Sequence, residues 1–543
     1  MQLQSSAGRH GADKLPSHSQ ELTLERDVAL SQSLVWERQR DYYVRKGVSA
    51  WSEDHVPNYI TNNSFTAEAY ARIVCAFICD CLRSNSESSS HPSPSTKFRI
   101  LELGAGSGKF AYLFLLQLTS QLRSQNVSPD CFSYCMADCS PSLLEWWRNN
   151  EHLSTFAANG QLSFELLDLR QDLSCEFLKD PGSPLIAIAN YVFDSLPQDA
   201  FTIKDGTILE TVVTTSVPEH QSHDVTSSNL ELTFKNIPVG NARYAEPRWN
   251  DLLLHYATAV PAATVLFPVA ALQTIRKLKH CSDGRLMVLA ADKGYVHEDD
   301  FSSGTGEPHF EFHQPNCFSQ TVNFDAIARD CRVVGGEALL PDKHASNLSL
   351  AACIFGVDGP SFTRKAYRET VEAFGVDDLF ALMAWLRPHL TRATPVELLA
   401  VLRLSRWDPV ALMELFPLFS VQLPPASGQR HDLRDAVMSV WNNYYPISES
   451  DKLLAFNCGV ILLQLHYFDE ARAMFERSQK ILGPSAPNSY NLYLCALGAG
   501  RTEEALEFAR EAAKLDQTFQ LARAAIAELE QILPGAKGEP AIH

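Results

Sequence analysis

The chain has 543 residues, of which 45% are hydrophobic, and its formal net charge is −18. A chain of this length exceeds a single hydrophobic core and predicts about three or four domain-sized units. The acidic balance argues against nucleic acid as a partner, because binding phosphates needs clustered Lys and Arg. No apolar run reaches the length of about 18 residues that a membrane span needs, so no membrane partner is expected either.

The N-terminal part is predicted to be polar first and helical afterwards. Residues 1–22 are predicted to be disordered, and they lack the apolar core of a secretory signal. They carry acids early and few arginines, which disfavours but does not exclude a mitochondrial presequence, and we expect a cytoplasmic protein. Residues 23–95 are predicted to form a helical segment, with a helix at 65–78 and a flexible loop at 84–95 that is rich in Ser and Pro.

Short apolar runs then alternate with helical patterns over residues 96–365. Buried strands are predicted at 98–104, 132–138, 162–168, 185–191 and 284–292. Residues 207–216 and 229–237 are predicted to form a hairpin or paired strands. Alternation of strands and helices predicts an α/β domain with a largely parallel, Rossmann-like sheet and helices on both faces.

The predicted strands stop after about residue 365, and the rest of the chain is predicted to be all-α. Residues 366–438 are predicted to be a helical linker domain, broken at 421–432, and residues 439–535 to be helical repeats. Ala471 and Ala505 lie 34 residues apart, within the phrases FDEARAMF and TEEALEFA. That period is typical of the tetratricopeptide repeat, and an ordinary helical hairpin is the alternative.

A glycine-rich loop, Glu102-Leu-Gly104-Ala105-Gly106-Ser-Gly108, lies between the first buried strand and its helix. A phosphate-binding P-loop is ruled out, because Leu103 and Phe110 replace its first glycine and its hydroxyl residue. A dinucleotide fingerprint is ruled out as well, because Lys109 stands at its last glycine position. The pattern E-x-G-x-G-x-G instead resembles the first motif of class I S-adenosylmethionine-dependent methyltransferases. Glycines there let the main chain approach the cofactor closely.

Acids follow three successive predicted strands, at Glu102, Asp138 and Asp168. Ligands of open α/β sheets bind at the carboxyl ends of the strands, so these acids are expected to face one crevice. A lone acid after a strand is more often a helix cap or a solvated turn, but three of them beside a glycine loop favour a cofactor site. The methyltransferase resemblance implies that Glu102 lies near the methionine end, Asp138 at the ribose hydroxyls and Asp168 by the adenine.

A closer resemblance rests on an ordered set of segments across residues 59 to 335. They are Tyr59-Ile-Thr61, Asn190-Tyr-Val-Phe-Asp194-Ser-Leu-Pro197 with the later Glu210, Phe267-Pro-Val-Ala, Asp292-Lys293-Gly294 and Val322-Asn-Phe-Asp. Together they resemble the MidA-like methyltransferases, a family that includes the mitochondrial assembly factor of respiratory complex I. The resemblance implies methylation of protein arginine with S-adenosyl-L-methionine as cofactor. It implies cofactor contacts from Thr61, Glu102, Gly104, Ala105, Gly106, Gly108, Asp138, Asp168 and Asn190.

The acceptor side departs from that family, since Tyr191 stands where its members have Glu, and Lys293 where they have Tyr. Methyl transfer from a sulfonium is an in-line displacement, so the protein mainly aligns the acceptor and excludes water. A nitrogen acceptor also needs a carboxylate or carbonyl nearby. Asn190 and Asp194 are the candidate catalytic residues, and a turn cap is the alternative for Asp194.

No metal site is expected. Cys131, Cys135 and Cys139 are spaced too widely for a zinc or iron–sulfur set and fit a buried strand, as small apolar side chains. His309 and His313 lie in an acidic loop, but their spacing matches no compact ligand set. The remaining cysteines are scattered through apolar stretches, which is typical of reduced, buried thiols in an intracellular protein.

Three functions remain open from the sequence. The leading one is a methyltransferase that acts on a protein, with the helical tail recruiting the substrate or a partner. The second is a non-catalytic scaffold that keeps the fold, which the Tyr191 departure favours. The third is a small-molecule methyltransferase whose repeats serve only for dimerisation. The fold does not choose among them.

Overall fold

The structure is a computed structural model. It describes residues 21–53, 56, 58–88, 96–171, 173–221, 229–240, 242–301, 306–313, 317–342, 347–422 and 427–533. Of the residues predicted to be disordered, 1–20 lie outside the described residues, as does the part of the predicted loop at 89–95, whereas residues 21–22 instead begin a strand. Residues 84–88, which were predicted to belong to that loop, instead continue a helix.

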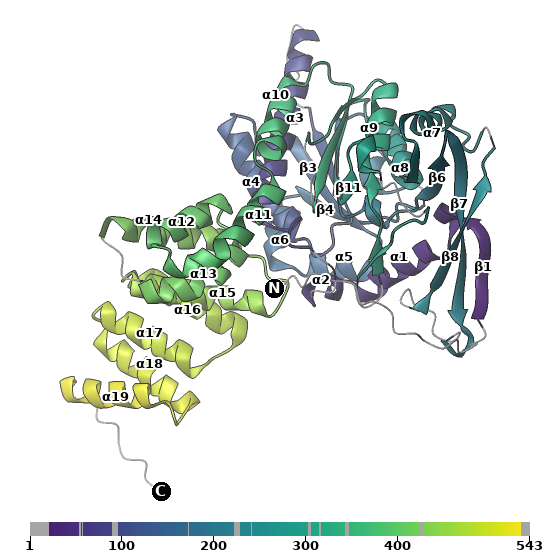
Figure 1. The fold of residues 1–543 in the computed structure, drawn as a ribbon. Helices are drawn as coiled ribbons and strands as arrows, with labels where there is room; N and C mark the ends of the chain where they lie inside the picture. Colours follow the sequence, from purple (N-terminus) through teal and green to yellow (C-terminus); the bar gives the residue numbers. More distant parts are fainter. Residues whose placement is uncertain are drawn as a thin grey trace.

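A seven-stranded sheet forms the centre of the molecule (Figure 1). Its strands are β2 (Phe98–Leu103), β3 (Phe132–Asp138), β4 (Leu162–Leu166), β5 (Leu185–Asn190), β10 (Leu286–Asp292), β15 (Glu337–Leu339) and β16 (Ser349–Phe355), in the order β15-β16-β10-β5-β2-β3-β4. The run from β10 to β4 is parallel, which confirms the predicted sheet, and β16 is antiparallel to β10. The strand β16 was not predicted.

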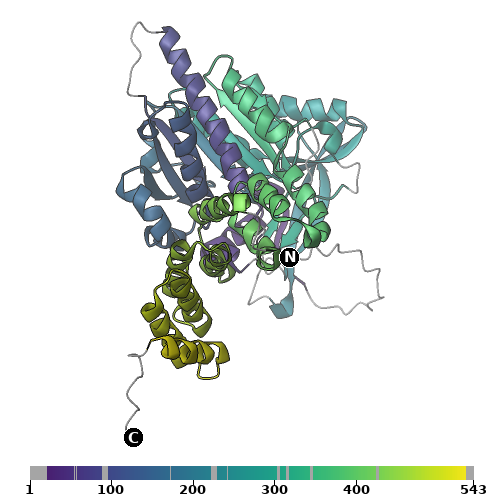
Figure 2. The same ribbon diagram turned by 90° about the vertical axis from the view of Figure 1, so that its left-hand side faces the viewer.

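Helices cover both faces of this sheet, as predicted (Figure 2). One face carries α3 (Ser64–Ser88), α4 (Lys109–Ser124), α5 (Pro141–Arg148), α6 (Glu151–Ala158) and α10 (Ser361–Tyr367), and the other carries α7 (Pro247–Ala259), α8 (Val269–His280) and α9 (Phe324–Val333). Successive strand residues point to opposite faces, so Ile100 lies in one core and Leu101 in the other. Two-sided burial explains the continuous apolar runs that revealed these strands.

A second, antiparallel sheet lies beside the first. It contains β1 (Glu21–Ala29), β6 (Asp199–Lys204), β7 (Thr207–Pro218), β8 (Glu231–Pro238) and β9 (Ala262–Phe267). The pairing of β7 with β8 confirms the predicted paired strands. The strand β1 corrects the prediction that residues from 23 onward are helical, because this segment pairs with β7 nearly 200 positions later, with Val28 opposite Val213. A partner that distant leaves no local pattern.

Short elements complete the α/β part. The N-terminal helices are α1 (Val35–Lys46) and α2 (Ser49–Ser52), and two small ladders pair β11 (Gly294–Tyr295) with β14 (Val322–Asn323) and β12 (Glu311–His313) with β13 (Cys317–Ser319). The 3-10 turns are η1 (Leu30–Gln32), η2 (Pro129–Cys131), η3 (Glu176–Leu178), η4 (Phe193–Ser195), η5 (Glu219–Gln221), η7 (Glu298–Asp300), η9 (Arg387–Arg392) and η10 (Ser450–Leu453), and η8 (Arg368–Glu372) is a π-turn.

After β16 the described residues are all-α, as predicted. The helices are α11 (Val376–Leu386), α12 (Pro395–Leu404), α13 (Pro409–Gln422), α14 (Ser427–Asn442), α15 (Leu454–Gln464), α16 (Phe468–Leu482), α17 (Ala486–Gly498), α18 (Thr502–Leu515) and α19 (Gln520–Ile532). The break predicted at 421–432 is therefore too long, because helix covers 421–422 and 427–432. In Figure 1 the green helices α11–α14 lie between the α/β part and the yellow helices α17–α19.

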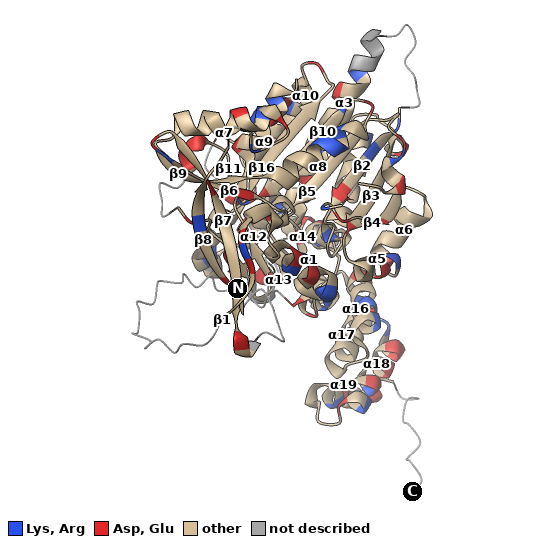
Figure 3. Ribbon diagram, turned by 90° about the vertical axis from the view of Figure 1, so that its right-hand side faces the viewer, with Lys and Arg blue, Asp and Glu red and all other residues tan. Residues whose placement is uncertain are grey.

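The last helices pair as antiparallel neighbours, α15 with α16 and α17 with α18. The helices α16 and α18 begin at residues 468 and 502, a spacing of 34 residues, and Ala471 and Ala505 are both fully buried. The tetratricopeptide assignment stays a prediction. None of the described helices is both long and apolar enough to cross a membrane. Seen from the side drawn in Figure 3, Lys and Arg are interspersed with Asp and Glu.

Candidate functional site

A cavity of about 420 Å³ opens at the carboxyl ends of β2, β3 and β5. Its size lies within the range of small-molecule sites, which is about 300–1,000 Å³. The predicted site residues that line it are Thr61, Glu102, Gly104, Ala105, Gly106, Asp138, Asp168, Asn190 and Asp194. Among the predicted residues Gly108 alone is absent from this lining. The structure therefore brings residues as far apart in the sequence as Thr61 and Asp194 to one cavity.

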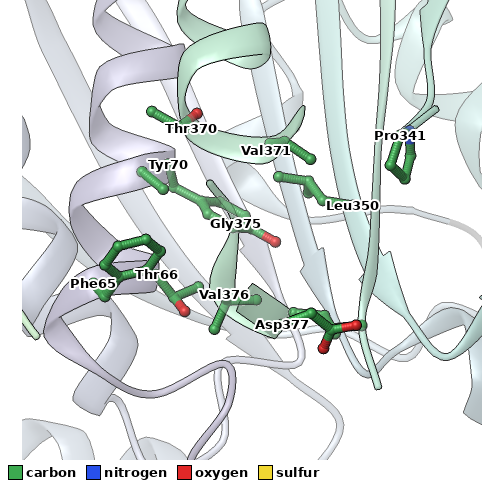
Figure 4. Close-up of a pocket in the computed structure, with 12 residues that line it drawn as sticks. Phe65, Thr66, Tyr70, Pro341, Leu350, Thr370, Val371, Gly375, Val376 and Asp377 are labelled. Atoms are coloured by element: carbon green, nitrogen blue, oxygen red, sulfur yellow. The ribbon is translucent and has the colours of Figure 1, made fainter. Parts of the chain in front are cut away.

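A second cavity, of about 40 Å³, lies behind α3 and is far too small for a nucleoside (Figure 4). Phe65, Tyr70, Leu350 and Val376 are among its largely apolar lining residues. The cavity of about 420 Å³ is the candidate site, because the glycine loop and the acids at the strand ends line it.

The glycine loop needs glycine at each of its three predicted positions, for different reasons. Gly104 and Gly106 have positive φ angles of 66° and 53°, and a Cβ on Gly106 would come within 3.0 Å of the Trp51 ring in the cavity wall. Gly108, with φ of 83°, precedes α4, and a Cβ there would lie 2.9 Å from both Met136 and the Tyr445 hydroxyl. Gly108 is thus needed for close packing, and its predicted cofactor contact stays a prediction.

Hydrogen bonds hold the loop in place from the neighbouring strand and from α5. The amide of Ala105 donates to the Ala137 carbonyl at 3.1 Å, and the amide of Gly106 donates to Asp138 Oδ2 at 3.2 Å. The Trp147 indole donates to the Gly106 carbonyl at 2.9 Å. The main chain of the loop is therefore fixed before any ligand arrives, which lowers the entropic cost of binding.

Glu102 is buried at the base of the cavity, with 4% of its surface exposed. The Tyr134 hydroxyl donates to its Oε2 at 2.9 Å. Burial raises the pKa of Glu102 to about 8, with a further contribution from the charge of Asp138. A cationic group bound beside Glu102 would favour its ionised form.

Asp138 ends β3, and its carboxylate accepts from two main-chain amides, those of Gly106 and Ser140, each at 3.2 Å. Burial raises the pKa of Asp138, although these hydrogen bonds work against the shift. The amide and the thiol of Cys139 also hydrogen-bond this carboxyl, which lines the cavity and can accept from hydroxyl groups of a ligand.

Asp168 lies two residues beyond β4 and forms ion pairs with two arginines. Arg40 Nε lies 2.7 Å from Asp168 Oδ2, and Arg170 Nε lies 3.4 Å from Oδ1. Burial works to raise the pKa of Asp168, but the hydrogen bonds and charges of Arg170 and Arg40 outweigh it, so the pKa lies below its ordinary value. Asp168 thus ties α1 to the cavity wall as an ionised carboxylate.

Asn190, at the end of β5, uses its side-chain oxygen in a hydrogen bond, whereas its side-chain nitrogen has no partner among the described residues. The Tyr70 hydroxyl donates to its Oδ1 at 2.6 Å. Its Nδ2 is buried and has no hydrogen-bond partner among the described residues. A buried donor without a partner is costly, so this amide fits a ligand acceptor atom in the cavity.

Asp194 lies in the turn η4 and is 7% exposed, facing Asp292 at the end of β10. Burial raises the pKa of Asp194 to about 7, while the Ser195 hydroxyl, 2.9 Å from Oδ1, works in the opposite direction. Burial and the charge of Asp194 raise the pKa of Asp292 well above its ordinary value. Each of these two buried carboxyls therefore keeps its proton to a higher pH than an exposed aspartate does.

The acceptor side of the cavity contains both departures from the family pattern, Tyr191 and Lys293, together with Glu311 and His313. Tyr191 lines it with a φ of +52°, which is rare for a residue with a side chain and is typical of functional sites. Lys293 Nζ pairs with Glu311 Oε2 at 2.6 Å, and His313 Nε2 lies 2.9 Å from Ser319 Oγ.

Further wall residues escaped the sequence reasoning, because they come from α1, α2 and a loop without any motif of their own. They are Arg40, Tyr43, Trp51 and Arg170. Among the described residues no group of three or more His, Cys, Asp or Glu side chains is placed to hold a metal ion.

Comparison with protein families gives one match. Residues 75–318, just under half of the chain, match the model of a family described as "Putative S-adenosyl-L-methionine-dependent methyltransferase". The matched segment contains the glycine loop and all the acids that line the cavity, from Glu102 to Glu311. A search of curated proteins finds no match.

Solved structures show weaker similarity. Two proteins from Burkholderia thailandensis are each 14% identical over 62% of this chain, with TM-scores of 0.37 and 0.36. The first is described as uncharacterized and is covered over 89% of its length; the second, covered over 95%, is described as a "likely methyl transferase" bound to S-adenosyl-homocysteine. A MamA fragment from Desulfovibrio magneticus is 16% identical over 30% of this chain and 98% of its own, with a TM-score of 0.21. TM-scores this low do not establish a shared fold.

The residues of the cavity fit the predicted cofactor, since they offer a main-chain cradle, acids for ribose hydroxyls and an amide without a partner. Together with the family match, they support S-adenosyl-L-methionine as the cofactor and methyl transfer as the reaction class of residues 75–318.

Proposed function

We propose that the protein is an S-adenosylmethionine-dependent methyltransferase that acts on a protein, with an arginine side chain as the candidate acceptor and the helical tail as the recruiting element. The observation that carries the methyltransferase assignment is the cavity in which Glu102, Gly106 and Asp138 meet at adjacent strand ends. The arginine acceptor rests on the MidA-like resemblance and on the acidic groups of the acceptor side.

The bound cofactor would supply a methyl group on a sulfonium, which reacts by in-line displacement. Glu102 would hold the methionine end, and Asp138 would accept hydrogen bonds from the ribose hydroxyls. The indole of Trp51 would close the cavity over Gly106 and exclude water.

The carboxyl pair of Asp194 and Asp292 is suited to the proton that a nitrogen acceptor releases. As the nitrogen–carbon bond forms and the sulfur–carbon bond breaks, the nitrogen becomes cationic and loses a proton. The carboxyl of Asp194 lines the cavity, and in its ionised form it can orient the acceptor and then take that proton. Asn190 Nδ2 would help to align the reacting groups.

The alternative is a non-catalytic scaffold that keeps the cofactor site. Tyr191 favours it, since this side chain occupies the position of a family glutamate and lines the cavity. On this alternative the helical tail performs the function, through a partner protein.

Calorimetry with S-adenosylmethionine and S-adenosylhomocysteine, followed by transfer of labelled methyl into a cell lysate, tests the proposal. We expect binding of both compounds and label in the protein fraction. Asp194→Asn should lower transfer at least about tenfold and leave S-adenosylhomocysteine affinity within about twofold. The exposed Asp205→Asn is the matched control.

The outcomes separate the candidates. Absence of binding to either compound would exclude the methyltransferase. Binding without transfer to any acceptor would favour the scaffold, and label only in small molecules would exclude the protein substrate.

A further inference from the structure

The C-terminal helical region contacts the glycine loop of the candidate site from behind. Tyr445, three residues after α14, is 1% exposed, and its hydroxyl donates to the Ser107 carbonyl of the glycine loop at 2.8 Å. Asn150 Nδ2 donates to the same hydroxyl at 3.0 Å. A Cβ on Gly108 would also meet this hydroxyl, at 2.9 Å. The tyrosine thus lies against the main chain of the loop.

A second contact joins the helical region to the opposite wall. Asp408, which precedes α13, is 1% exposed and accepts from the Tyr59 hydroxyl at 2.9 Å and from the Ser64 amide at 2.8 Å. These two residues flank Thr61, which lines the cavity. The ion pair of Arg406 with Glu68, at 2.9 Å, lies on the next turn of α3.

Both contacts are hydrogen bonds between buried polar groups, whereas a neighbouring tyrosine hydroxyl forms none in the described part of the chain. The neighbouring Tyr444 is buried to a similar degree, with 5% exposed, yet its hydroxyl has no hydrogen-bond partner among the described residues. The Ser107 carbonyl accepts from the Trp146 indole as well, at 3.1 Å. Neither Tyr445 nor Trp146 lines the cavity, so both fix the loop from behind.

We infer that the C-terminal helical region is part of the cofactor site, with Tyr445 as a positioning residue that fixes the glycine loop, so that cofactor binding and docking of the helical region favour each other. The inference rests on the proposed function. Coupling between two binding free energies is reciprocal. A change that loosens the helical region therefore weakens cofactor binding, and cofactor binding stabilises the docking of the helical region. A partner bound to α15–α19 could thereby change cofactor affinity.

The test compares Tyr445→Phe with Tyr444→Phe in the full chain. Each variant removes one buried hydroxyl and keeps its ring, but only the first breaks the bonds to Ser107 and Asn150. S-adenosylhomocysteine binding, measured by calorimetry, should weaken at least about threefold and up to on the order of tenfold in Tyr445→Phe and remain unchanged in Tyr444→Phe. Tyr59→Phe, on the opposite wall, should weaken binding as well.

Hydrogen exchange distinguishes coupling to cofactor binding from a purely structural role of Tyr445. In the wild-type protein S-adenosylhomocysteine should slow amide exchange at residues 441–445, and in Tyr445→Phe this response should shrink. Equal affinities in wild type and Tyr445→Phe, with no exchange response at 441–445, would overturn the coupling while leaving the methyltransferase intact. A wild-type protein that binds no S-adenosylhomocysteine would overturn both.

Discussion

At the residue scale, the cavity depends on a few backbone positions that favour glycine and on carboxyls whose pKa values burial raises. The acids follow the strands as the sequence predicts, yet their surroundings differ. Glu102 and Asp194 are buried with raised pKa values, whereas Asp168 is held ionised by two arginines. The same residue type therefore has different chemistry according to what packs around it.

Gly106 can be tested against a glycine with the same backbone strain. Gly106→Ala places a Cβ 3.0 Å from Trp51 at φ +53°, whereas Gly160, at φ +70°, has no atom within 4 Å of its Cβ position. Both alanine variants should lose about 1–2 kcal/mol of stability from the left-handed conformation. Only Gly106→Ala should weaken S-adenosylhomocysteine binding, at least about tenfold, in calorimetry. Equal affinities of the two variants would contradict the role given to the loop.

Glu102 predicts a pH dependence of stability. Its pKa is raised from 4.5 to about 8 in the folded protein, so the folded protein binds this proton more tightly than the unfolded chain does. The resulting stabilisation is complete below about pH 4.5 and is lost as pH rises through about 8, with a magnitude on the order of a few kcal/mol.

Thermal unfolding between pH 5.5 and 8.5 measures this effect. Asp194 and Asp292 titrate with the same sign, so the wild-type slope is composite. Glu102→Gln keeps a partner for the Tyr134 hydroxyl and should flatten the slope by the share of Glu102. A variant with the wild-type slope would show that Glu102 ionises normally.

At the element scale, the strands of the parallel sheet and their helices follow from local pattern, and the edge elements do not. The strand β3 begins and ends where its apolar run does. In contrast, β1 is a charged edge strand whose nine residues are mostly exposed, and it forms because β7 offers it a partner. The cysteines are another example: Cys135 is buried within β3, as the predicted strand requires.

The helical tail offers a matched pair of glycines for testing its packing. A Cβ on Gly459 of α15 would lie 2.7 Å from the Phe475 ring on α16, whereas the Cβ position of Gly428 in α14 is open. Gly459→Ala should destabilise the protein by about 1–3 kcal/mol, because overpacking outweighs the gain in helix propensity. Gly428→Ala should stabilise it by up to about 1 kcal/mol. Chemical denaturation measures both, and shifts of the same sign would contradict the predicted packing of α15 on α16.

At the scale of the whole molecule, the helical region contacts the α/β part beside the candidate site. Residues 59–64 at one wall and residues 106–108 at the other each contact the helical region, through Asp408 and Tyr445. The division into a catalytic domain and a separate recruiting tail, which the sequence suggests, remains a prediction. The contacts add a structural role for the tail at the cofactor site, independent of any partner that it binds.

The sequence by itself determined the parallel sheet, the helical C-terminal region and the glycine loop with its acids, because periodicity and short motifs are local properties of the chain. It located most of the cavity for the same reason, since parallel strands bring their carboxyl ends to one edge. Only the tertiary structure decided that Arg40 and Arg170 neutralise Asp168, that Asp194 faces Asp292, and that Tyr445 supports the loop. Each of these is a contact between distant segments, and the free energy of such a contact depends on burial that no local pattern records.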